Sequence, residues 1–495
     1  MSQIYVSNLT FAYEGSYDNI FENVHFQIDT DWKLGFTGRN GRGKTTFLRL
    51  IQGQLEYSGT ISANVEFDYF PFEVQHKEYL TIDVIGEVYP DYLHWKLIRE
   101  LNWLNVSEDL LYRPFNTLSN GEQTKVLLAA LFIKDNRFLL IDEPTNHLDL
   151  HARKLVADYL NRKSGFILVS HDRAFLDRCV DHILSINKTN IEIQKGNFST
   201  WWENKQRQDQ FELAQNEKLK RDVQRLSDSA KRTSGWSHEV ESTKNGTRNS
   251  GSKVDKGYIG HKAAKMMKRS KAIQQRQLSA IEEKSKLLKN IENAESLQIA
   301  PLPFYKERLA ELDHISVSYE SKTVCEDVTF EIQQGERIAL SGANGSGKSS
   351  ILKLICGEDI PYNGGFHKDA QLKISYVAQD TSHLRGDLSE YAKSCGIDES
   401  LFKSILRKLD FSRLQFEKDI STYSGGQKKK VLIARSLSER AHLYIWDEPL
   451  NFVDIISRMQ IEELLLEYTP TLLFVEHDSE FVSNIATKVV ELSGR

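Results

Sequence analysis

Short apolar runs bounded by polar residues and turn formers recur along this chain and predict β-strands. Ile4–Phe11 and Val24–Ile28 show the pattern near the start, and Leu312–Ser318 and Val328–Ile332 show it again in the second half. In both places a further apolar strand, a glycine-rich loop and a helix follow. Strands that alternate with helices in this way predict an α/β fold with a core of parallel strands.

The same pattern places two similar domains at residues 1–197 and 309–495, with a different segment, 198–308, between them. The length of 495 residues fits about three domains of ordinary size. The longest apolar runs, such as Val126–Ile133, are far shorter than the roughly 18 residues that a membrane-spanning helix requires. We therefore expect two tandem α/β domains and a linker, without a membrane segment.

The linker is polar and rich in lysine. Helical stretches at about 200–232 and 262–296 flank a segment, 233–260, that contains 5 glycines and many Ser, Thr and Asn residues. This order predicts an antiparallel helical hairpin whose tip lies near residues 242–257. A helix of about 35 residues would be roughly 50 Å long. A plain solvated linker is the alternative, but a flexible tether needs no hairpin.

Charge is distributed unevenly. The net charge is −5, yet residues 218–276 contain 16 Lys and Arg against 5 Asp and Glu. A basic segment on an acidic body indicates a polyanionic partner. The 4 cysteines form no C-x-x-C pair, which argues against a structural zinc site and for a reducing compartment. Met1–Tyr5 begins a strand pattern without a signal-like segment, so we expect a cytoplasmic protein.

Two loops, Gly38–Thr45 and Gly342–Ser349, match the pattern G-x-x-x-x-G-K-[ST]. Such a loop points backbone N–H groups into a concavity that holds phosphates at a helix N-terminus. The lysine of each loop would reach the β- and γ-phosphates, and the hydroxyl of the next residue would bind Mg²⁺. The residues predicted to hold the nucleotide are Gly38, Asn40, Gly41, Gly43, Lys44, Thr45 and Thr46 in the first copy, and Gly342, Asn344, Gly345, Gly347, Lys348, Ser349 and Ser350 in the second.

An apolar strand in each copy ends in two adjacent carboxylates, Asp142 with Glu143 and Asp447 with Glu448. A strand that delivers such a pair to its C-terminal edge suits phosphoryl chemistry. The aspartate would orient Mg²⁺ and its waters, and the glutamate would polarise the attacking water. Repetition of the pair at matched positions makes an accidental surface ion pair a poor alternative.

A histidine follows the next apolar strand in each copy, His171 and His477, where it can hydrogen-bond a γ-phosphate oxygen. Ser119–Glu122 and Ser424–Gln427, called the signatures below, place a serine and small residues before a helix and make a second anion cradle. Each feature alone has a common structural explanation. The whole set recurs, however, in the same order and at nearly equal spacing, which indicates a tandem duplication of an ATPase domain.

This ordered set resembles the ABC ATPase family in both copies. The resemblance implies two tandem ABC-type nucleotide-binding domains joined by a long α-helical hairpin linker, with ATP and Mg²⁺ as cofactors. Each ATP would lie between the phosphate loop of one copy and the signature of the other. Tyr13 and Tyr319 would stack on adenine, and Asp149 and Asp454 would lie in loops that act across the interface. The further residues implied to contact nucleotide are Ser119, Gly121, Glu122, Gln379, Ser424, Gly425, Gly426 and Gln427, of which Gln379 would also bind the metal.

Two such domains on one chain with a charged helical linker resemble the ABC-F subfamily. The linker segments Arg232–Ser237 and Asp255–Ser270 are similar to those of Lsa-type antibiotic-resistance members. The resemblance implies a monomer that binds the bacterial 70S ribosome, at 23S rRNA and the exit-site tRNA, without a membrane permease or DNA as partner. It also implies protection against lincosamides, streptogramin A compounds and pleuromutilins. The linker residues expected to bind ribosomal RNA are Trp236, Lys244, Arg248, Lys253 and Lys256.

Three positions depart from the family pattern. Phe72 stands where the family has a glutamine, which the second copy keeps as Gln379. Asn120 replaces a glycine of the first signature, and Pro449–Asp454 differs from Pro144–Asp149. These changes bear on whether the two sites turn over equally, and they leave the phosphate loops and the paired acids untouched.

Three other functions fit parts of the pattern. The motor subunit of an ABC transporter would need no long basic hairpin and would fractionate with membranes. ATPases of DNA maintenance in this superfamily carry zinc modules or very long coiled coils, and the sequence contains neither. A housekeeping translation factor of the same subfamily would share the ribosome as partner, and only the linker text separates it from a resistance protein.

Overall fold

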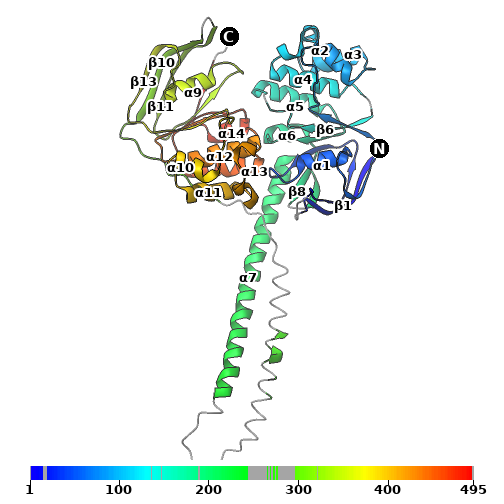
Figure 1. Ribbon diagram of the computed structural model, residues 1–495, viewed down its shortest axis with the longest axis vertical. Coiled ribbons are helices and arrows are strands. Elements are labelled where there is room, and N and C mark those ends of the chain that lie inside the picture. The colour runs from blue at the N-terminus through cyan, green and yellow to red at the C-terminus, as the bar shows by residue number, and fades with distance from the viewer. Residues whose placement is uncertain are drawn as a thin grey trace, which may run out of the picture. The chain divides into compact units, whose positions relative to one another are not determined.

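The computed structural model describes residues 2–14, 19–134, 136–146, 148–187, 190–242, 296–319 and 322–492, with a few further residues between 265 and 276. The chain forms two compact units, Met1–Trp201 with Ala294–Arg495, and Trp202–Asn293. The first unit holds both repeats, and Figure 1 labels their elements.

The first domain combines six core strands with helices that follow them. Its elements are β1 (Gln3–Phe11), β2 (Phe21–Asp29), β3 (Lys33–Thr37), α1 (Lys44–Ile51), β4 (Ser58–Ser62), β5 (Glu66–Phe70), α2 (Thr81–Val88), α3 (His94–Trp103), η1 (Glu108–Tyr112), η2 (Phe115–Thr117), α4 (Asn120–Leu131), β6 (Arg137–Asp142), α5 (Leu150–Asn161), β7 (Phe166–Val169), α6 (Arg173–Cys179), β8 (His182–Asn187) and β9 (Asn190–Lys195).

The second domain repeats this order with one strand fewer at its end. Its elements are β10 (Arg308–Tyr319), β11 (Lys322–Gln333), β12 (Arg337–Ser341), α9 (Lys348–Cys356), β13 (Tyr362–Lys368), β14 (Ile374–Val377), α10 (Leu388–Ser394), α11 (Glu399–Lys408), η3 (Arg413–Glu417), η4 (Ile420–Thr422), α12 (Gly425–Ser438), β15 (Leu443–Asp447), α13 (Ile455–Tyr468), β16 (Leu472–Val475), α14 (Ser479–Ile485) and β17 (Lys488–Glu491).

Each domain has a parallel core sheet, which confirms the predicted α/β class. The strand orders are β5-β6-β7-β3-β8-β9 and β14-β15-β16-β12-β17, and only β9 runs antiparallel to its neighbour. The central strands β7 and β16 are buried along their whole length, as expected of a sheet covered on both faces. The carboxyl ends of β6 and β15 carry the paired acids, so the topology places them at the edge where ligands of parallel sheets bind.

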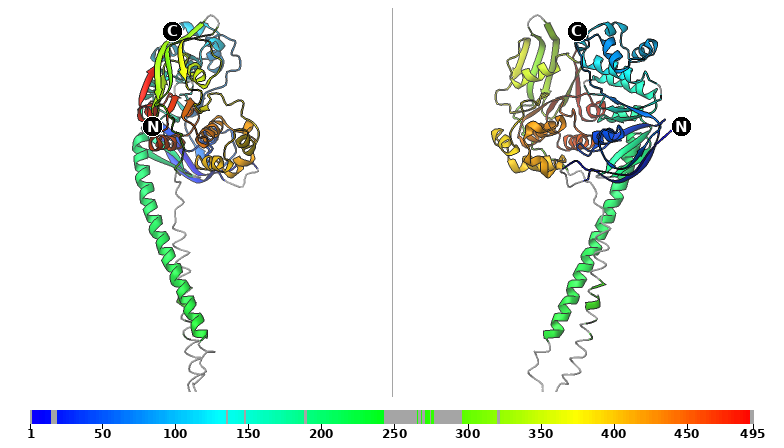
Figure 2. Two further views of the ribbon diagram at one scale, coloured as in Figure 1. Left: turned by 90° about the vertical axis from the view of Figure 1, so that its left-hand side faces the viewer. Right: turned by 45° about the vertical axis from the view of Figure 1, so that its right-hand side comes forward.

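A second, antiparallel sheet accompanies each core sheet, and the sequence pattern did not predict it. The orders are β2-β1-β4 and β11-β10-β13. In the first domain this sheet shares an apolar core with α1 and one face of the parallel sheet. In the second domain the antiparallel sheet and the helices α10–α12 lie at opposite ends (Figures 1 and 2). Period-two patterns identify strands but carry no information about the direction of their partners.

The linker begins with α7 (Phe198–Ser242), a helix of 45 residues. Phe198 and Trp201 are buried at its start, and the following turns carry i,i+4 ion pairs such as Lys205–Asp209 at 3.1 Å. The predicted end of this helix near residue 232 is wrong, because α7 continues through Gly235 to Ser242. One glycine costs a helix only about 1 kcal/mol, which a helix of this length tolerates.

Much of the predicted hairpin falls on residues that the structure does not describe. Trp236 lies within α7. Lys244, Arg248, Lys253 and Lys256 lie outside the described residues, as do the predicted tip after Ser242 and most of the second helix. In the part of the chain that is described, no helix combines the length and the apolar character that crossing a bilayer demands.

Candidate nucleotide sites

Each phosphate loop joins a buried core strand to a helix, β3 to α1 and β12 to α9. The residue before each helix, Gly43 or Gly347, has a left-handed backbone with φ of 97° and 86°, which only glycine adopts without strain. Lys44 Nζ donates to Gly38 O at 2.7 Å, and Lys348 makes the matching bond at 2.8 Å. Both lysines are buried, and burial lowers their pKa, so an anionic phosphate bound in the loop would favour their charged form.

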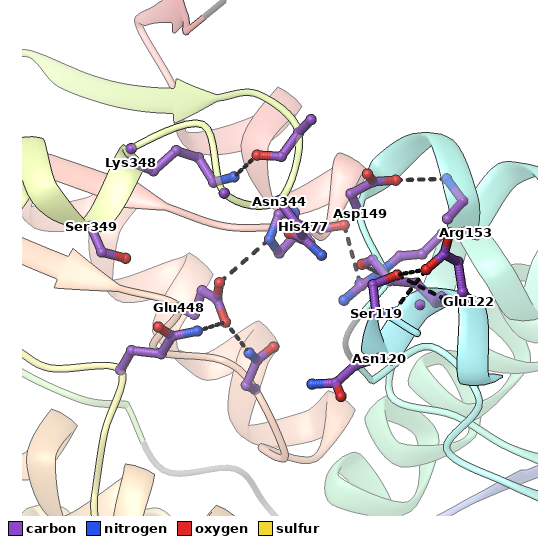
Figure 3. Close-up of a pocket in the computed structure, with 18 of the residues that line it drawn as sticks. Ser119, Asn120, Glu122, Asp149, Arg153, Asn344, Lys348, Ser349, Glu448 and His477 are labelled. Carbon is purple, nitrogen blue, oxygen red and sulfur yellow. Dashed lines mark hydrogen bonds and ion pairs between the residues drawn. The ribbon is translucent and has the colours of Figure 1, made fainter. Parts of the chain in front are cut away.

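The second phosphate loop shares a cavity of about 670 Å³ with residues of the first domain (Figure 3). This volume lies in the range of small-molecule and cofactor sites. The lining residues from the first domain include Ser119, Gly121, Glu122, Lys125, Asp149 and Arg153, and those from the second include Asn344, Gly345, Gly347, Lys348, Ser349, Ser350, Gln379, Glu448, Asn451 and His477. The structure therefore brings together the phosphate loop of one copy and the signature of the other.

Glu448 is held by three side chains that converge on it (Figure 3). Gln379 Nε2 and Asn451 Nδ2 donate to Glu448 Oε2 at 2.9 and 2.5 Å, and His477 Nε2 lies 3.5 Å from Oε1. Burial alone would raise the pKa of Glu448, but its contacts with His477 and Gln379 bring the pKa below its usual value. A carboxylate that stays ionised and is fixed in direction suits the polarisation of water.

Asp447, at the end of β15, has the character of a cation ligand. It is buried, and neither of its carboxylate oxygens has a hydrogen-bond partner among the described residues. Burial raises its pKa to about 6. A buried carboxylate beside the Ser349 hydroxyl fits Mg²⁺, which prefers oxygen ligands. The described residues contain no cluster of three His, Cys, Asp or Glu that could hold a metal ion.

The acids of the first copy are arranged differently. Asp142 Oδ2 accepts from Thr45 Oγ1 at 3.2 Å and from Tyr69 Oη at 2.9 Å. His171 Nε2 lies 3.3 Å from Glu143 Oε1. Burial and the neighbouring Asp142 raise the pKa of Glu143 to about 8. The same motif residues thus lie together in both copies, but with different partners.

Strand register explains one of these differences. Phe70 pairs with Ile141 and Val377 pairs with Trp446, so the second residue after each strand is Phe72 in one copy and Gln379 in the other. The Phe72 ring packs edge-on against Tyr89, with ring centroids 6.0 Å apart. An aromatic ring offers no donor to a carboxylate, whereas Gln379 does.

We expect Gln379→Phe, which copies the first site, to lower kcat by about tenfold, because Glu448 loses one of the donors that keep it ionised and oriented. Steady-state hydrolysis of ATP measures this. Phe72→Gln is the matched control and should leave kcat within about twofold of the wild-type value, since it leaves the contact between Gln379 and Glu448 untouched. An unchanged rate in Gln379→Phe would contradict the importance of the contact.

The tyrosines proposed to stack on adenine occupy matched places. Tyr13 Oη lies 2.9 Å from Thr46 Oγ1, and Tyr319 Oη donates to Ser350 Oγ at 3.1 Å. The two residues are 44% and 40% exposed, which is high for large aromatic residues. An aromatic face beside the phosphate loop is therefore open to a base in each copy.

The signature residues act as helix caps. Ser119 and Ser424 are the N-caps of α4 and α12, and each accepts from the backbone of Glu122 or Gln427 in a capping box. Sequence reasoning missed Arg153, whose Nη1 donates both to Asp172 Oδ2 at 3.0 Å and to His477 O of the other domain at 3.1 Å. The sequence did contain a signal for it, because an arginine stands four residues after Asp149 and also four residues after Asp454.

Comparison with known proteins agrees with this geometry. A family model described as "ABC transporter" matches residues 21–146 and 325–451. The chain is 26% identical to "Probable ATP-binding protein YbiT" of Escherichia coli O157:H7 over 98% of this chain and 95% of that protein. It is 27% identical to "Ribosome protection protein VmlR" of Bacillus subtilis (strain 168), over 97% of this chain and 85% of that protein.

Solved structures show the same fold at lower sequence identity. The structure of an archaeal ribosome recycling factor, aABCE1, in complex with the ribosomal stalk protein aP1 matches with a TM-score of 0.63 and 18% identity, over 99% of this chain and 88% of that one. The family match spans half of the chain and includes both phosphate loops and both acidic strand ends. The chain therefore belongs to the ABC transporter family, as a tandem pair of ATP-hydrolysing domains of the ABC-F type.

Proposed function

We propose that this ATPase binds the bacterial ribosome near the exit site and protects the peptidyl-transferase centre from lincosamides, streptogramin A compounds and pleuromutilins. The observation that carries the proposal is α7, a 45-residue polar helix that begins the basic linker between two ATPase domains. The relative named as a ribosome protection protein, similar over nearly the whole chain, supports it. ATP would gate the insertion of the linker.

The gating follows from how the second site is built. Its cavity is lined by both domains, so a nucleotide there contacts Lys348 and the signature of the first domain together. ATP binding would favour the closed arrangement of the domains, and hydrolysis assisted by Glu448 would release it. Mg²⁺, held by Asp447 and Ser349, would neutralise phosphate charge. The linker lies between the domains in sequence and would be inserted or withdrawn with this cycle.

Binding to ribosomal RNA should depend on salt. We expect cosedimentation with ribosomes in ATP, and a log–log decline of affinity with salt of about 0.7 to 0.9 per phosphate contact. Lys218→Gln, Lys220→Gln and Arg221→Gln, which neutralise exposed cations of α7, should reduce the slope by about 2 to 3 in all. The control neutralises three exposed cations of the second domain, Lys393, Arg413 and Lys418. This control should change the slope less. Cosedimentation indifferent to both ATP and salt would contradict ribosome binding.

The predicted tip should carry the protective effect. Deleting residues 242–257 is expected to keep folding and ATP hydrolysis but to abolish drug resistance, because the nucleotide-site residues lie in other parts of the chain. Susceptibility of cells that express the deleted protein measures this, and replacement of the same residues by a Gly-Ser segment of equal length tests whether composition matters. Full resistance from the deleted protein would contradict the proposal and favour the helix ends near Trp236.

The main alternative is a housekeeping translation factor of the same subfamily. It predicts the same ATP-dependent and salt-dependent ribosome binding, without any change in drug susceptibility. The two functions are therefore separated by growth in drug and not by sedimentation.

A further inference from the structure

The phosphate loop of the first site contacts the second domain directly. At the first site, Asn40 Nδ2 in the phosphate loop donates to the carbonyl oxygen of Phe452 in the other domain at 2.7 Å. Arg39 Nη1 and Arg42 Nη2 lie 3.6 and 3.4 Å from Asp410 Oδ1, in the turn that follows α11. The loop that would hold the phosphates is thus joined directly to the second domain.

A buried ion pair joins the domains on the same side. Arg173 begins α6, two residues after His171. Its Nη2 lies 2.6 Å from Glu462 Oε2 on α13, and its Nε lies 3.2 Å from Glu480 Oε2 on α14. The Arg173 and Glu462 side chains are only 8% and 10% exposed. A planar guanidinium between two carboxylates is held in a defined geometry.

At the second site, neutral residues stand at the positions that match Arg39, Arg42 and Asp410. Ala343 and Ser346 occupy the places of Arg39 and Arg42 in the second loop. Asn105, two residues after α3, matches Asp410, two residues after α11, and both have a positive φ. No ion pair between residues of these types is possible.

The residues that match the buried ion pair also differ on the side of the second site. Ser479 begins α14 as Arg173 begins α6, and Ala157 and Ala174 match Glu462 and Glu480. These three small residues line a cavity of about 90 Å³. The volume that a guanidinium and two carboxylates fill on one side is therefore open on the other. The hydrogen bond from Arg153 to His477 O crosses between the domains on that second side.

We propose that Arg39, Arg42 and Arg173, here called the clamp, keep the first nucleotide site closed through the ATPase cycle, so that nucleotide exchange takes place at the second site. Opening the first site must separate charge pairs, and close charge pairs across an interface often couple favourably. Opening the second site separates no ion pair at the positions that match the clamp, because Ala343, Ser346 and Ser479 stand there. The domains would then hinge on the clamp side and open the cavity of about 670 Å³.

The contacts of Gln379 and of the matched Phe72 agree with a difference between the two sites. Gln379 supports Glu448 only at the second site, whereas Phe72 packs against Tyr89 at the first. The proposal rests on ATP hydrolysis by the two domains and not on ribosome binding, so it is tested with the purified full chain in the absence of ribosomes.

Nucleotide release from the full chain tests the clamp. The protein is loaded with radiolabelled ATP and Mg²⁺ and chased with excess unlabelled ATP. We expect two phases of release, each of about one nucleotide per chain, with rates at least about tenfold apart. A tenfold difference in rate corresponds to a difference of about 1.4 kcal/mol in the free-energy barrier to release. Lys44→Ala should remove the slow phase and Lys348→Ala the fast one. A single phase in the native chain, or the opposite assignment of phases, would overturn the proposal.

Clamp variants test the cause of the slow phase. Arg173→Ser with Glu462→Ala and Glu480→Ala copies the second side and leaves no buried charge unpaired, so the slow phase should accelerate by about tenfold or more. Ser479→Arg with Ala157→Glu and Ala174→Glu should slow the fast phase. Arg308→Ser with Glu311→Ala, which removes an exposed ion pair of 2.8 Å within the second domain, is the matched control and should change neither phase.

A thermal melt shows whether each variant folds. If the triple variant does not fold, Arg39→Ala with Arg42→Ser removes the other half of the clamp, whose shared partner Asp410 is 26% exposed, and it should also accelerate the slow phase. Unchanged phases in every folded clamp variant would overturn the proposal.

Discussion

The double variant Glu143→Gln with Glu448→Gln is expected to hydrolyse ATP about 10²- to 10⁴-fold more slowly than the wild type while still binding it. Both side chains follow the aspartates that end β6 and β15, and each has a histidine nitrogen within 3.5 Å. An amide of the same size keeps the packing but cannot accept a proton from water. The phosphate loops with Lys44 and Lys348 are untouched, so binding should persist.

Phosphate release and nucleotide binding, measured on the same preparation, check this prediction. Glu192→Gln with Glu463→Gln makes the same change of charge at exposed positions and should hydrolyse ATP at the wild-type rate. Wild-type hydrolysis by the site variant would show that these glutamates do not polarise the attacking water.

Gly426→Ala is expected to lower ATP hydrolysis by about 10²-fold, because a displacement of roughly 1 Å in an active site costs this much. A methyl group at Gly426 would overlap the carbonyl oxygen of Phe452 and lie 3.0 Å from Asn40 Nδ2. The carbonyl of Phe452 is also the acceptor for Asn40. The substitution therefore displaces the signature and the contact between the domains together.

Gly86→Ala is the matched control for this variant. Gly86 lies in α2, and a methyl group there meets no atom within 4 Å. Alanine favours a helix by about 1 kcal/mol over glycine, so this variant should be at least as stable as the wild type and equally active. Full activity in Gly426→Ala, with a normal melting curve, would contradict the close approach described for the signature.

Local chemistry explains why much of the architecture was predictable. A phosphate loop needs a left-handed residue before its helix, so Gly43 and Gly347 mark the start of α1 and α9 in sequence and in structure. Paired acids at the end of an apolar strand mark β6 and β15 in the same way. The repeated order of these motifs was sufficient to predict two α/β domains with parallel cores.

Contacts between distant residues were not predictable from the pattern. Arg39 and Asp410 belong to no shared motif, and nothing local indicates that an arginine at position 173 meets Glu462 of the other domain. The role of Asp410 is recognised only from the structure, because the fold brings its turn beside the phosphate loop. The end of α7 was also not predictable, because Gly235 and the Ser and Thr residues beside it favour a break, whereas the helix continues to Ser242.

Growth in the presence of drug tests the central claim, that ATP-gated insertion of the linker protects the ribosome. Minimal inhibitory concentrations of a lincosamide, a streptogramin A compound and a pleuromutilin are measured in susceptible bacteria that carry an empty vector, the wild-type chain or the Glu143→Gln, Glu448→Gln variant. We predict higher values for all three drugs with the wild-type chain only. Unchanged susceptibility at confirmed expression, with the protein bound to ribosomes, would contradict protection and leave a translation factor without a resistance role.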